Sequence, residues 1–326
     1  MPMEWNILRV SSSKALGSDF ILQEKCLLTS LGANNYFFLE NPQDKLSLDN
    51  LKETSQIIML TNTHTKLEKI PAWILKRTSL LIHSNSGMDN FHPQILADLP
   101  CPIITGNSIR SAAVTEYIMA CLFHHITSIN DTPVWPENRL WNRRRICDLN
   151  ILVYGFGHIG KKVARTLKSL EAKVTVIDPH VHDPINVLPS NHQLPMEQFD
   201  CLILCCELNQ ENQEFINHQF LAKLSPQILI INPARGQLIK LKDLFEFLKN
   251  HQNAKAYLDV FEPEPFPFHE YFHLKNLIKS PHTAGVYAQL SENILKFEFQ
   301  VIKKWMEYHP KTQNFINHFQ DIIYKK

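Results

Sequence analysis

Three polar side chains that could act together on one small substrate follow short apolar runs in the second half of this 326-residue chain. Arg235 comes just after QILIIN, Glu264 lies in the proline-rich turn DVFEPEP, and His282 follows NLIKS. An arginine can bind a carboxylate through two parallel hydrogen bonds, and a histidine can give or take a proton near neutral pH. A carboxylate beside the imidazole orients its ring. Hydride transfer on a 2-hydroxy acid needs this set of residue types.

A glycine motif upstream predicts where a hydride-carrying nucleotide would bind. The run ILVYGFGHIG spaces Gly155, Gly157 and Gly160 as G-x-G-x-x-G between a β-prone run and a helix-forming segment. The first glycine of such a motif permits a tight turn, the second lets the backbone approach a pyrophosphate, and the third lets the helix pack closely on the sheet. The phosphates would then meet the positive end of the helix that starts near His158.

One acidic residue completes this nucleotide motif. Asp178 ends the β-prone run KVTVID, where a carboxylate accepts both ribose hydroxyls of NAD and repels the 2′-phosphate of NADP. We therefore expect NAD as the cofactor. The alternative is a glycine-rich turn in an ordinary α/β domain, but the strand before the motif, the helix after it and the acid favour the nucleotide.

Alternating β-prone and helical segments predict an α/β fold built from doubly wound parallel sheets. Strands are expected at NILRV, NYFFL, QIIML and SLLIHSN, and helices at 20–31 and 67–76. Further strands at FDCLILCC, QILIIN, AKAYLDV and NLIKS alternate with the helices HQFLAKL and LKDLFEFLKN. Long helices are predicted at 110–129 and 290–307. Ligands bind beyond the carboxyl ends of parallel strands, so the loops TNTHT and SNSGMDN also become candidate binding loops.

Composition narrows the class of protein. The chain has 33 Lys and Arg against 32 Asp and Glu, a net charge of +1, which gives no argument for binding nucleic acid or an anionic membrane. Seven cysteines without a C-x-x-C pair support neither a disulfide framework nor a zinc site, and we expect no metal. No leader-like or membrane-spanning apolar run occurs, so we expect a cytoplasmic protein.

Together these motifs resemble the D-isomer-specific 2-hydroxyacid dehydrogenases over nearly the whole chain. The matching motifs are SGMDN at 86–90, VTEYI at 114–118, GFGHIG at 155–160, NPARG at 232–236, DVFEPEP at 259–265 and PHTAG at 281–285. The resemblance implies two doubly wound parallel-sheet domains. An NAD-binding Rossmann domain at 103–284 would be inserted into a flavodoxin-like substrate-binding domain made of 1–102 and 285–326. It also implies a homodimer that pairs through the helix after Arg110 and the segment 131–141.

The resemblance further assigns roles to individual residues. Arg235 would bind the substrate carboxylate and polarise its 2-carbonyl group, His282 would be the acid/base, and Glu264 would be the partner of His282. Asp259 would bind the nicotinamide carboxamide. The implied cofactor contacts are Gly155, Gly157, His158, Ile159, Gly160, Asp178, Cys206, Ala234, Asp259 and Gly285. The implied contacts to a small 2-hydroxy or 2-keto acid are Thr63, Asn85, Ser86, Gly87 and Arg235.

Two departures from the family pattern leave alternatives open. The segment Cys205–Asn209 replaces the usual His-x-Pro, which puts the shape of the adenine pocket in doubt. Asn62 stands where members acting on phosphorylated acids often carry arginine, so Lys66 and Arg110 are the basic residues left for a phosphate. Singly, Arg235, Glu264 and His282 could each be an ordinary surface or packing residue. An NAD(H)-sensing protein similar to the corepressors of this fold is the alternative function.

Overall fold

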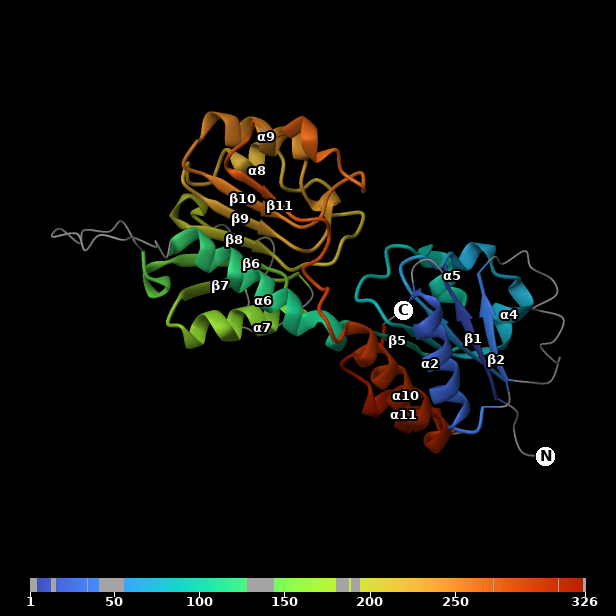
Figure 1. The fold of residues 1–326 in the computed structure, drawn as a ribbon. Coiled ribbons are helices and arrows are strands. Elements are labelled where there is room, and N and C mark those ends of the chain that lie inside the picture. Colours follow the sequence, from blue (N-terminus) through green and yellow to red (C-terminus); the bar gives the residue numbers. More distant parts are fainter. Residues whose placement is uncertain are drawn as a thin grey trace, which may run out of the picture. The chain divides into compact units, whose positions relative to one another are not determined.

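The computed structural model describes residues 5–12, 16–33, 35–40, 56–127, 144–179, 188, 194–271, 273–309 and 311–324. The chain divides into two units (Figure 1). Unit 1 combines Met1–Arg110 with Tyr287–Lys326, and unit 2 is Ser111–Val286. Each unit is built on one parallel sheet with helices on both faces. The prediction of two parallel-sheet α/β domains is therefore confirmed. The predicted dimer contact at 131–141 lies outside the described residues.

Unit 1 holds a five-stranded sheet in the order β2-β1-β3-β4-β5, the flavodoxin-like arrangement. Its apolar strands are buried on both faces, as in other parallel sheets. Helices α2, α10 and α11 cover one face, and α4 and α5 cover the other. The elements are β1 (Trp5–Val10), α2 (Ser18–Thr29), β2 (Asn35–Leu39), β3 (Gln56–Thr61), α4 (Ala72–Arg77), β4 (Thr78–His83), α5 (Pro93–Asp98), β5 (Ile103–Thr105), α10 (Leu290–Tyr308) and α11 (Thr312–His318).

Unit 1 differs from the sequence prediction in several elements, and helices α5 and α11 were not predicted. The helix expected at 67–76 is a 3-10 turn followed by α4, because Pro71 lacks the amide a continuous helix needs. The three-residue strand β5 was missed, and it pairs in parallel with β4. Residues 103–105 therefore belong to the first sheet, and the units divide at 110/111 and 286/287 rather than at 102/103 and 284/285.

Unit 2 holds a six-stranded sheet in the order β11-β10-β9-β8-β6-β7. Leu188 adds a parallel bridge outside β7, which extends the order to that of a dinucleotide-binding fold. Alternate strand residues face α6 and α7 on one side and α8 and α9 on the other (Figure 1). The elements are α6 (Asn107–Ile126), β6 (Asn150–Tyr154), α7 (His158–Ser169), β7 (Lys173–Ile177), β8 (Cys201–Leu204), α8 (His218–Leu221), β9 (Leu229–Asn232), α9 (Leu241–Asn250), β10 (Lys255–Leu258) and β11 (Leu277–Lys279).

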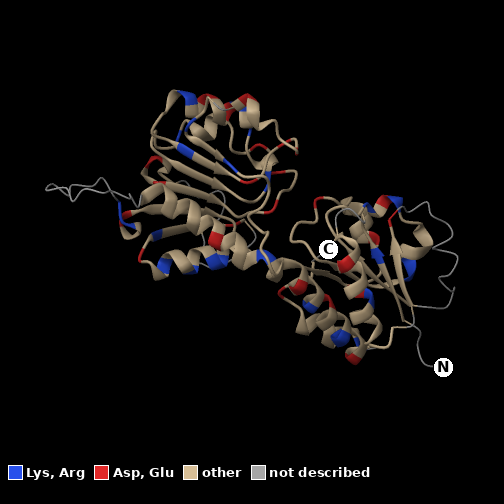
Figure 2. Ribbon diagram, viewed as in Figure 1, with Lys and Arg blue, Asp and Glu red and all other residues tan. Residues whose placement is uncertain are grey.

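Charge is evenly distributed over both units. Basic and acidic residues are interspersed along the ribbons (Figure 2). None of the helices in the described part of the chain is long and apolar enough to cross a bilayer.

A buried ion network joins β1, α2 and α10 inside unit 1. The Arg9 guanidinium binds both carboxylates, Glu24 through two nitrogens and Glu298 at 2.6 Å, and all three side chains are almost fully buried. The Tyr36 hydroxyl donates to Glu24. In this buried site the single positive charge of Arg9 cannot neutralise two negatively charged carboxylates. Arg9 holds the pKa of Glu24 below its usual value, whereas burial raises the pKa of Glu298 from 4.5 to about 8.

This network predicts that unit 1 loses stability as the pH rises. The folded protein keeps the Glu298 proton up to about pH 8, and an unfolded chain releases it near pH 4.5, so the free energy of unfolding falls with rising pH between these values. The slope reaches at most about 1.4 kcal/mol per pH unit for one proton. Glu298→Gln should flatten this slope in denaturant unfolding measured from pH 5 to 8.

The matched control is Glu292→Gln, on the same helix. Glu292 forms an exposed pair with Lys296, so its loss should leave the slope unchanged. An unaltered slope in Glu298→Gln would show that Glu298 is ionised in the folded protein at neutral pH.

Candidate active site

The three predicted catalytic residues leave neighbouring strands at one edge of the unit 2 sheet. Arg235 follows β9, Glu264 follows β10 and His282 follows β11. These strands are adjacent and parallel, so their carboxyl ends share one edge. The glycine motif follows β6 at the same edge.

The structure brings Glu264 and His282 into direct contact. His282 Nδ1 lies 2.8 Å from Glu264 Oε2, and the other carboxylate oxygen accepts the Phe261 amide at 2.9 Å. Because an ionised carboxylate only accepts, Nδ1 carries the proton, and Nε2 is left to exchange one with a substrate. The histidine side chain is 51% exposed, so solvent and small molecules can reach it.

The loop that carries His282 holds an uncommon backbone conformation. His282 has a φ of 54°, in the left-handed region, and its amide donates to the Asp259 carbonyl oxygen at 2.7 Å. The fully buried Asp259 carboxylate accepts the amides of Thr283 and Ala284, both at 2.8 Å, and the Ser280 hydroxyl at 2.6 Å. These contacts select the left-handed conformation over the alternatives.

The only role that the sequence predicts for Asp259 is a contact with the nicotinamide carboxamide. The structure adds an internal role, because Asp259 holds the backbone of the loop that carries His282. A carboxylate offers about four acceptor positions, and three protein donors occupy three of them. One position is left, and the contact with the carboxamide stays a prediction. The half-buried Gly285 follows this loop.

Arg235 lies in a turn that is held by hydrogen bonds of the Asn232 side chain. The Asn232 side chain accepts the Ala234 amide at 3.0 Å and donates to the Arg235 carbonyl oxygen at 2.9 Å. Gly236 packs against the Phe261 backbone so closely that a Cβ would collide with it. Asn232 is a positioning residue that sequence reasoning missed, although its place two residues before Ala234 in the NPARG motif was visible.

The glycine motif forms an open cradle at the start of α7. Gly155 has a φ of 106°, and a Cβ there would strike the backbone of Cys205 and Cys206. A Cβ on Gly160 would strike the Gly155 carbonyl oxygen, whereas one on the exposed Gly157 would meet nothing within 4 Å. The N-cap residue of α7 is Gly157, which has no side chain in front of the helix. The backbone at such a helix start is suited to a pyrophosphate.

His158 and Ile159 form the first turn of α7, with Ile159 packed on the core below. Asp178 follows β7, and its carboxylate accepts the Phe156 amide at 2.6 Å. The carboxylate therefore lies beside the glycine motif, where the ribose of a bound NAD would be expected.

The departure at Cys205–Asn209 forms an ordered loop despite its missing proline. Asn209 Oδ1 accepts two following amides, and the Asn212 side chain donates to the Glu207 carbonyl oxygen at 2.7 Å. Cys206 packs against the core, and burial raises the pKa of its thiol to about 12. Cys206 thus offers an apolar surface to the predicted adenine side.

In unit 1, the loop after β4 turns its carbonyl groups inward. The Gly106 amide donates to the carbonyl oxygens of His83 and Asn85, and Arg110 donates to that of Ser84. In the described part of the chain, the amides of Asn85, Ser86 and Gly87 donate to no protein acceptor. Such a run of unpaired amides suits a carboxylate.

A buried histidine braces this loop. His83 Nε2 lies 3.1 Å from the Gly87 carbonyl oxygen and Nδ1 lies 3.0 Å from the Thr61 hydroxyl. Burial lowers the pKa of His83 to about 3, so the ring is neutral, donates from Nε2 and accepts at Nδ1. Sequence reasoning missed His83 because it reads as the end of an apolar strand.

The loop after β3 carries Thr63, which is exposed. Asn90 Nδ2 donates to the carbonyl oxygens of Asn62 and Thr65, which ties this loop to the loop after β4. The Asn62 side chain is bound to Ser11 and to the His64 amide. The Asn62 side chain therefore holds the loop after β3 in place.

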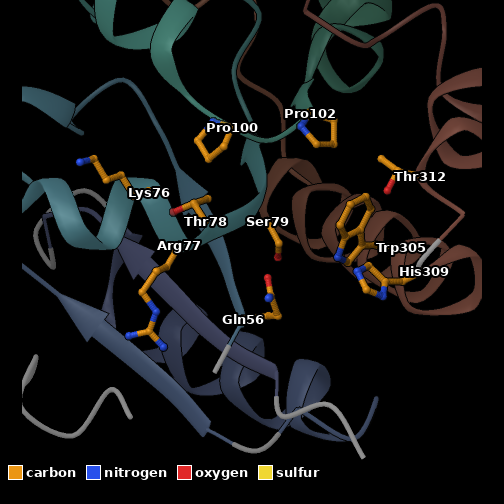
Figure 3. A pocket seen from close by; sticks show the side chains of 10 residues that line it. All are labelled: Gln56, Lys76, Arg77, Thr78, Ser79, Pro100, Pro102, Trp305, His309 and Thr312. Carbon is orange, nitrogen blue, oxygen red and sulfur yellow. The ribbon is translucent and has the colours of Figure 1, made fainter. Parts of the chain in front are cut away.

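Unit 1 also holds a pocket of about 420 Å³ (Figure 3). It is lined by Gln56 and Thr78, the first residues of β3 and β4, and by Trp305 and His309. The loops predicted to bind substrate follow the last residues of the same strands, so the pocket is at the opposite edge of the sheet. In the described ranges, no group of three His, Cys, Asp or Glu side chains could hold a metal ion.

Comparison with known proteins identifies the family. Residues 119–284 match the model of the D-isomer specific 2-hydroxyacid dehydrogenase, NAD binding domain. A D-3-phosphoglycerate dehydrogenase of Bacillus subtilis (strain 168) is 29% identical in an alignment of 248 residues that covers 68% of this chain and 46% of the relative. A glyoxylate reductase of Thermococcus gammatolerans is 31% identical over 158 residues, 45% of this chain and 47% of the relative. The chain thus spans about half the length of the curated relatives it matches.

Solved structures share the fold. A D-lactate dehydrogenase from Aquifex aeolicus superposes with a TM-score of 0.68 at 16% identity, covering 96% of this chain and 98% of that one. A probable 2-hydroxyacid dehydrogenase from Rhizobium etli CFN 42 gives 0.73 at 16% identity, covering 99% and 98%. With the family model matching about half of the residues, the chain belongs to the D-isomer-specific 2-hydroxyacid dehydrogenase family.

Proposed function

We propose that the protein is an NAD-dependent oxidoreductase that interconverts a small 2-keto acid and the corresponding D-2-hydroxy acid. The observation that carries this proposal is the His282–Glu264 pair, at the sheet edge that also holds Arg235 and the open glycine cradle. A protein that only binds the nucleotide has no chemical need for an exposed acid/base pair at that edge.

The fit of these residues to NAD rests on two features of unit 2. A side chain at position 157 would project into open space, and the Asp178 carboxylate lies beside the same loop. When bound there, NADH supplies the hydride for C2 of the keto acid. Ala234, which precedes Arg235, and Asp259 are the residues proposed to hold the nicotinamide end.

The chain's own residues then complete the reaction. Arg235 binds the substrate carboxylate and polarises the 2-carbonyl group through charge-assisted hydrogen bonds. His282 gives its Nε2 proton to the carbonyl oxygen, while Glu264 holds Nδ1–H and stabilises the cationic ring. The keto acid gains one hydride and one proton and becomes the hydroxy acid. Oxidation of the hydroxy acid runs through the same steps in reverse.

The substrate-side contacts are proposed for the loop after β4. Its outward amides at Asn85, Ser86 and Gly87 would bind the carboxylate, with Thr63 in the neighbouring loop. The relatives named above act on a phosphorylated acid and on glyoxylate, so both kinds of substrate belong in a first panel.

The test traces the hydrogen atom that NADH would transfer to C2 of the keto acid. The protein is incubated with a 2-keto acid and NADH deuterated at nicotinamide C4, and the product is analysed by mass spectrometry and chiral chromatography. A D-2-hydroxy acid with deuterium at C2 is the expected product. NADH binding without any deuterated product would support the NAD(H)-sensing alternative.

Asp178 should set the cofactor preference. Asp178→Ala removes the carboxylate that would bind the ribose hydroxyls and repel a 2′-phosphate, so the Kd for NADH should rise about tenfold and that for NADPH should fall. Fluorescence titration of both cofactors measures the change. Asp148→Ala, which removes an exposed carboxylate paired with Arg145, is the matched control. Unchanged selectivity in Asp178→Ala would remove Asp178 from the ribose site.

A further inference from the structure

A chain of hydrogen bonds links α6 to the loop that carries His282. The Tyr117 hydroxyl lies 2.7 Å from Ser280 Oγ, which lies 2.6 Å from Asp259 Oδ1. Tyr117 is in α6, Ser280 follows β11 and Asp259 follows β10. Three segments far apart in the sequence therefore meet at one buried carboxylate.

The Asp259 carboxylate fixes which group donates in each of these two hydrogen bonds. An ionised carboxylate only accepts, so the single Ser280 proton points to Asp259. The Tyr117 hydroxyl must then donate to Ser280 Oγ. Burial raises the pKa of Tyr117 well above its usual value, which keeps that proton in place. Hydrogen bonds aligned in this way polarise and strengthen one another.

The backbone that Asp259 holds is the acid/base loop itself. The Asp259 carbonyl oxygen accepts the His282 amide at 2.7 Å, and its carboxylate accepts the amides of Thr283 and Ala284. Asp259 has no exposed surface in this structure, and protein donors offset the charge of its carboxylate. Losing one donor leaves this charge less compensated beside the loop in which His282 has a positive φ.

We propose that Tyr117 and Ser280 are positioning residues for His282, acting through Asp259. This inference rests on the proposed function, in which His282 exchanges the proton. Neither Tyr117 nor Ser280 needs to touch the substrate. Their role is to keep the Asp259 carboxylate in the orientation that holds the His282 imidazole against Glu264.

The variants are chosen to change one hydroxyl at a time. Tyr117→Phe removes the first donor, Ser280→Ala removes the middle of the chain, and Ser280→Thr keeps a hydroxyl there. The matched control is Tyr257→Phe. Tyr257 also bonds α6, with its hydroxyl 2.7 Å from His124 Nδ1, but that bond leads away from Asp259.

Steady-state kinetics on a 2-keto acid give the first readout. Tyr117→Phe should lower kcat about fivefold, which is the factor expected from the loss of one neutral hydrogen bond. Ser280→Ala should lower kcat about tenfold or more. The KM for the keto acid should change less than twofold. Ser280→Thr and Tyr257→Phe should stay within about twofold of the parent kcat. Equal losses in Tyr117→Phe and Tyr257→Phe, or no rescue by threonine, would overturn the proposal.

A second readout does not depend on turnover. Histidine ring NMR, with the His282 signal assigned by its loss in His282→Ala, reports the Nδ1–H bond to Glu264 directly. Tyr117→Phe should shift this signal and Tyr257→Phe should not. If the parent protein reduces no 2-keto acid, the proposed function fails, but a shifted signal still supports the positioning network. An unshifted signal rejects the network whatever the activity.

Discussion

Replacing His282 with alanine should lower kcat for 2-keto acid reduction by about a hundred- to ten-thousand-fold, the range typical for loss of a general acid. The imidazole is exposed and bonded to Glu264, so it is available to supply the proton. The Kd for NADH should change less than about threefold, because the loop is held through the backbone of His282 and through Asp259. Steady-state kinetics and fluorescence titration measure the two quantities.

The matched control for this variant is His269→Ala. His269 also neighbours a glutamate and is largely exposed, but it belongs to a surface turn outside the site. It should leave kcat within twofold of the parent value. Turnover at the parent rate in His282→Ala would show that the proton comes from another group.

Replacing Arg235 should have an effect of similar size but of a different kind. Arg235→Ala removes a charge that would bind the substrate carboxylate, and truncating such a pair costs about 2 to 5 kcal/mol. The value of kcat/KM should therefore fall by about thirty- to several-thousand-fold. Arg235→Lys should recover only part of the loss, because an ammonium keeps the charge but not the two parallel hydrogen bonds. Substrate saturation curves measure this.

Arg144→Ala is the control for Arg235. Arg144 is an exposed arginine of the same unit, 2.8 Å from Asp200, and its loss removes one charge from the surface. Its kcat/KM should match that of the parent. Equal effects of Arg144→Ala and Arg235→Ala would point to general electrostatics rather than substrate binding.

Much of the fold could be predicted because parallel strands buried on both faces read as continuous apolar runs. QIIML and QILIIN became β3 and β9 for this reason. The three residues of β5 were too short for such a signal, and Pro71 interrupted a helical pattern whose spacing alone looked continuous. Because β5 was not predicted, the first boundary between the units was placed too early in the chain.

The site was predicted less completely than the fold. Motif spacing could place Arg235, Glu264 and His282 after adjacent strands, because the carboxyl ends of parallel strands meet. It could not reveal the bonds of Asp259 to Ser280, since those depend on side-chain directions in three dimensions. Tyr117 reads in the sequence as one more partly apolar residue of a long helix.

The most direct measurement of the central claim is NADH oxidation, followed at the nicotinamide absorbance band. The panel contains glyoxylate, pyruvate, hydroxypyruvate, 2-ketoisocaproate, phenylpyruvate and a phosphorylated 2-keto acid. We expect saturable oxidation with at least one of these acids, abolished in both Arg235→Ala and His282→Ala. Tight NADH binding without oxidation across the panel would contradict the enzyme assignment and leave the chain as a nucleotide sensor on a dehydrogenase fold.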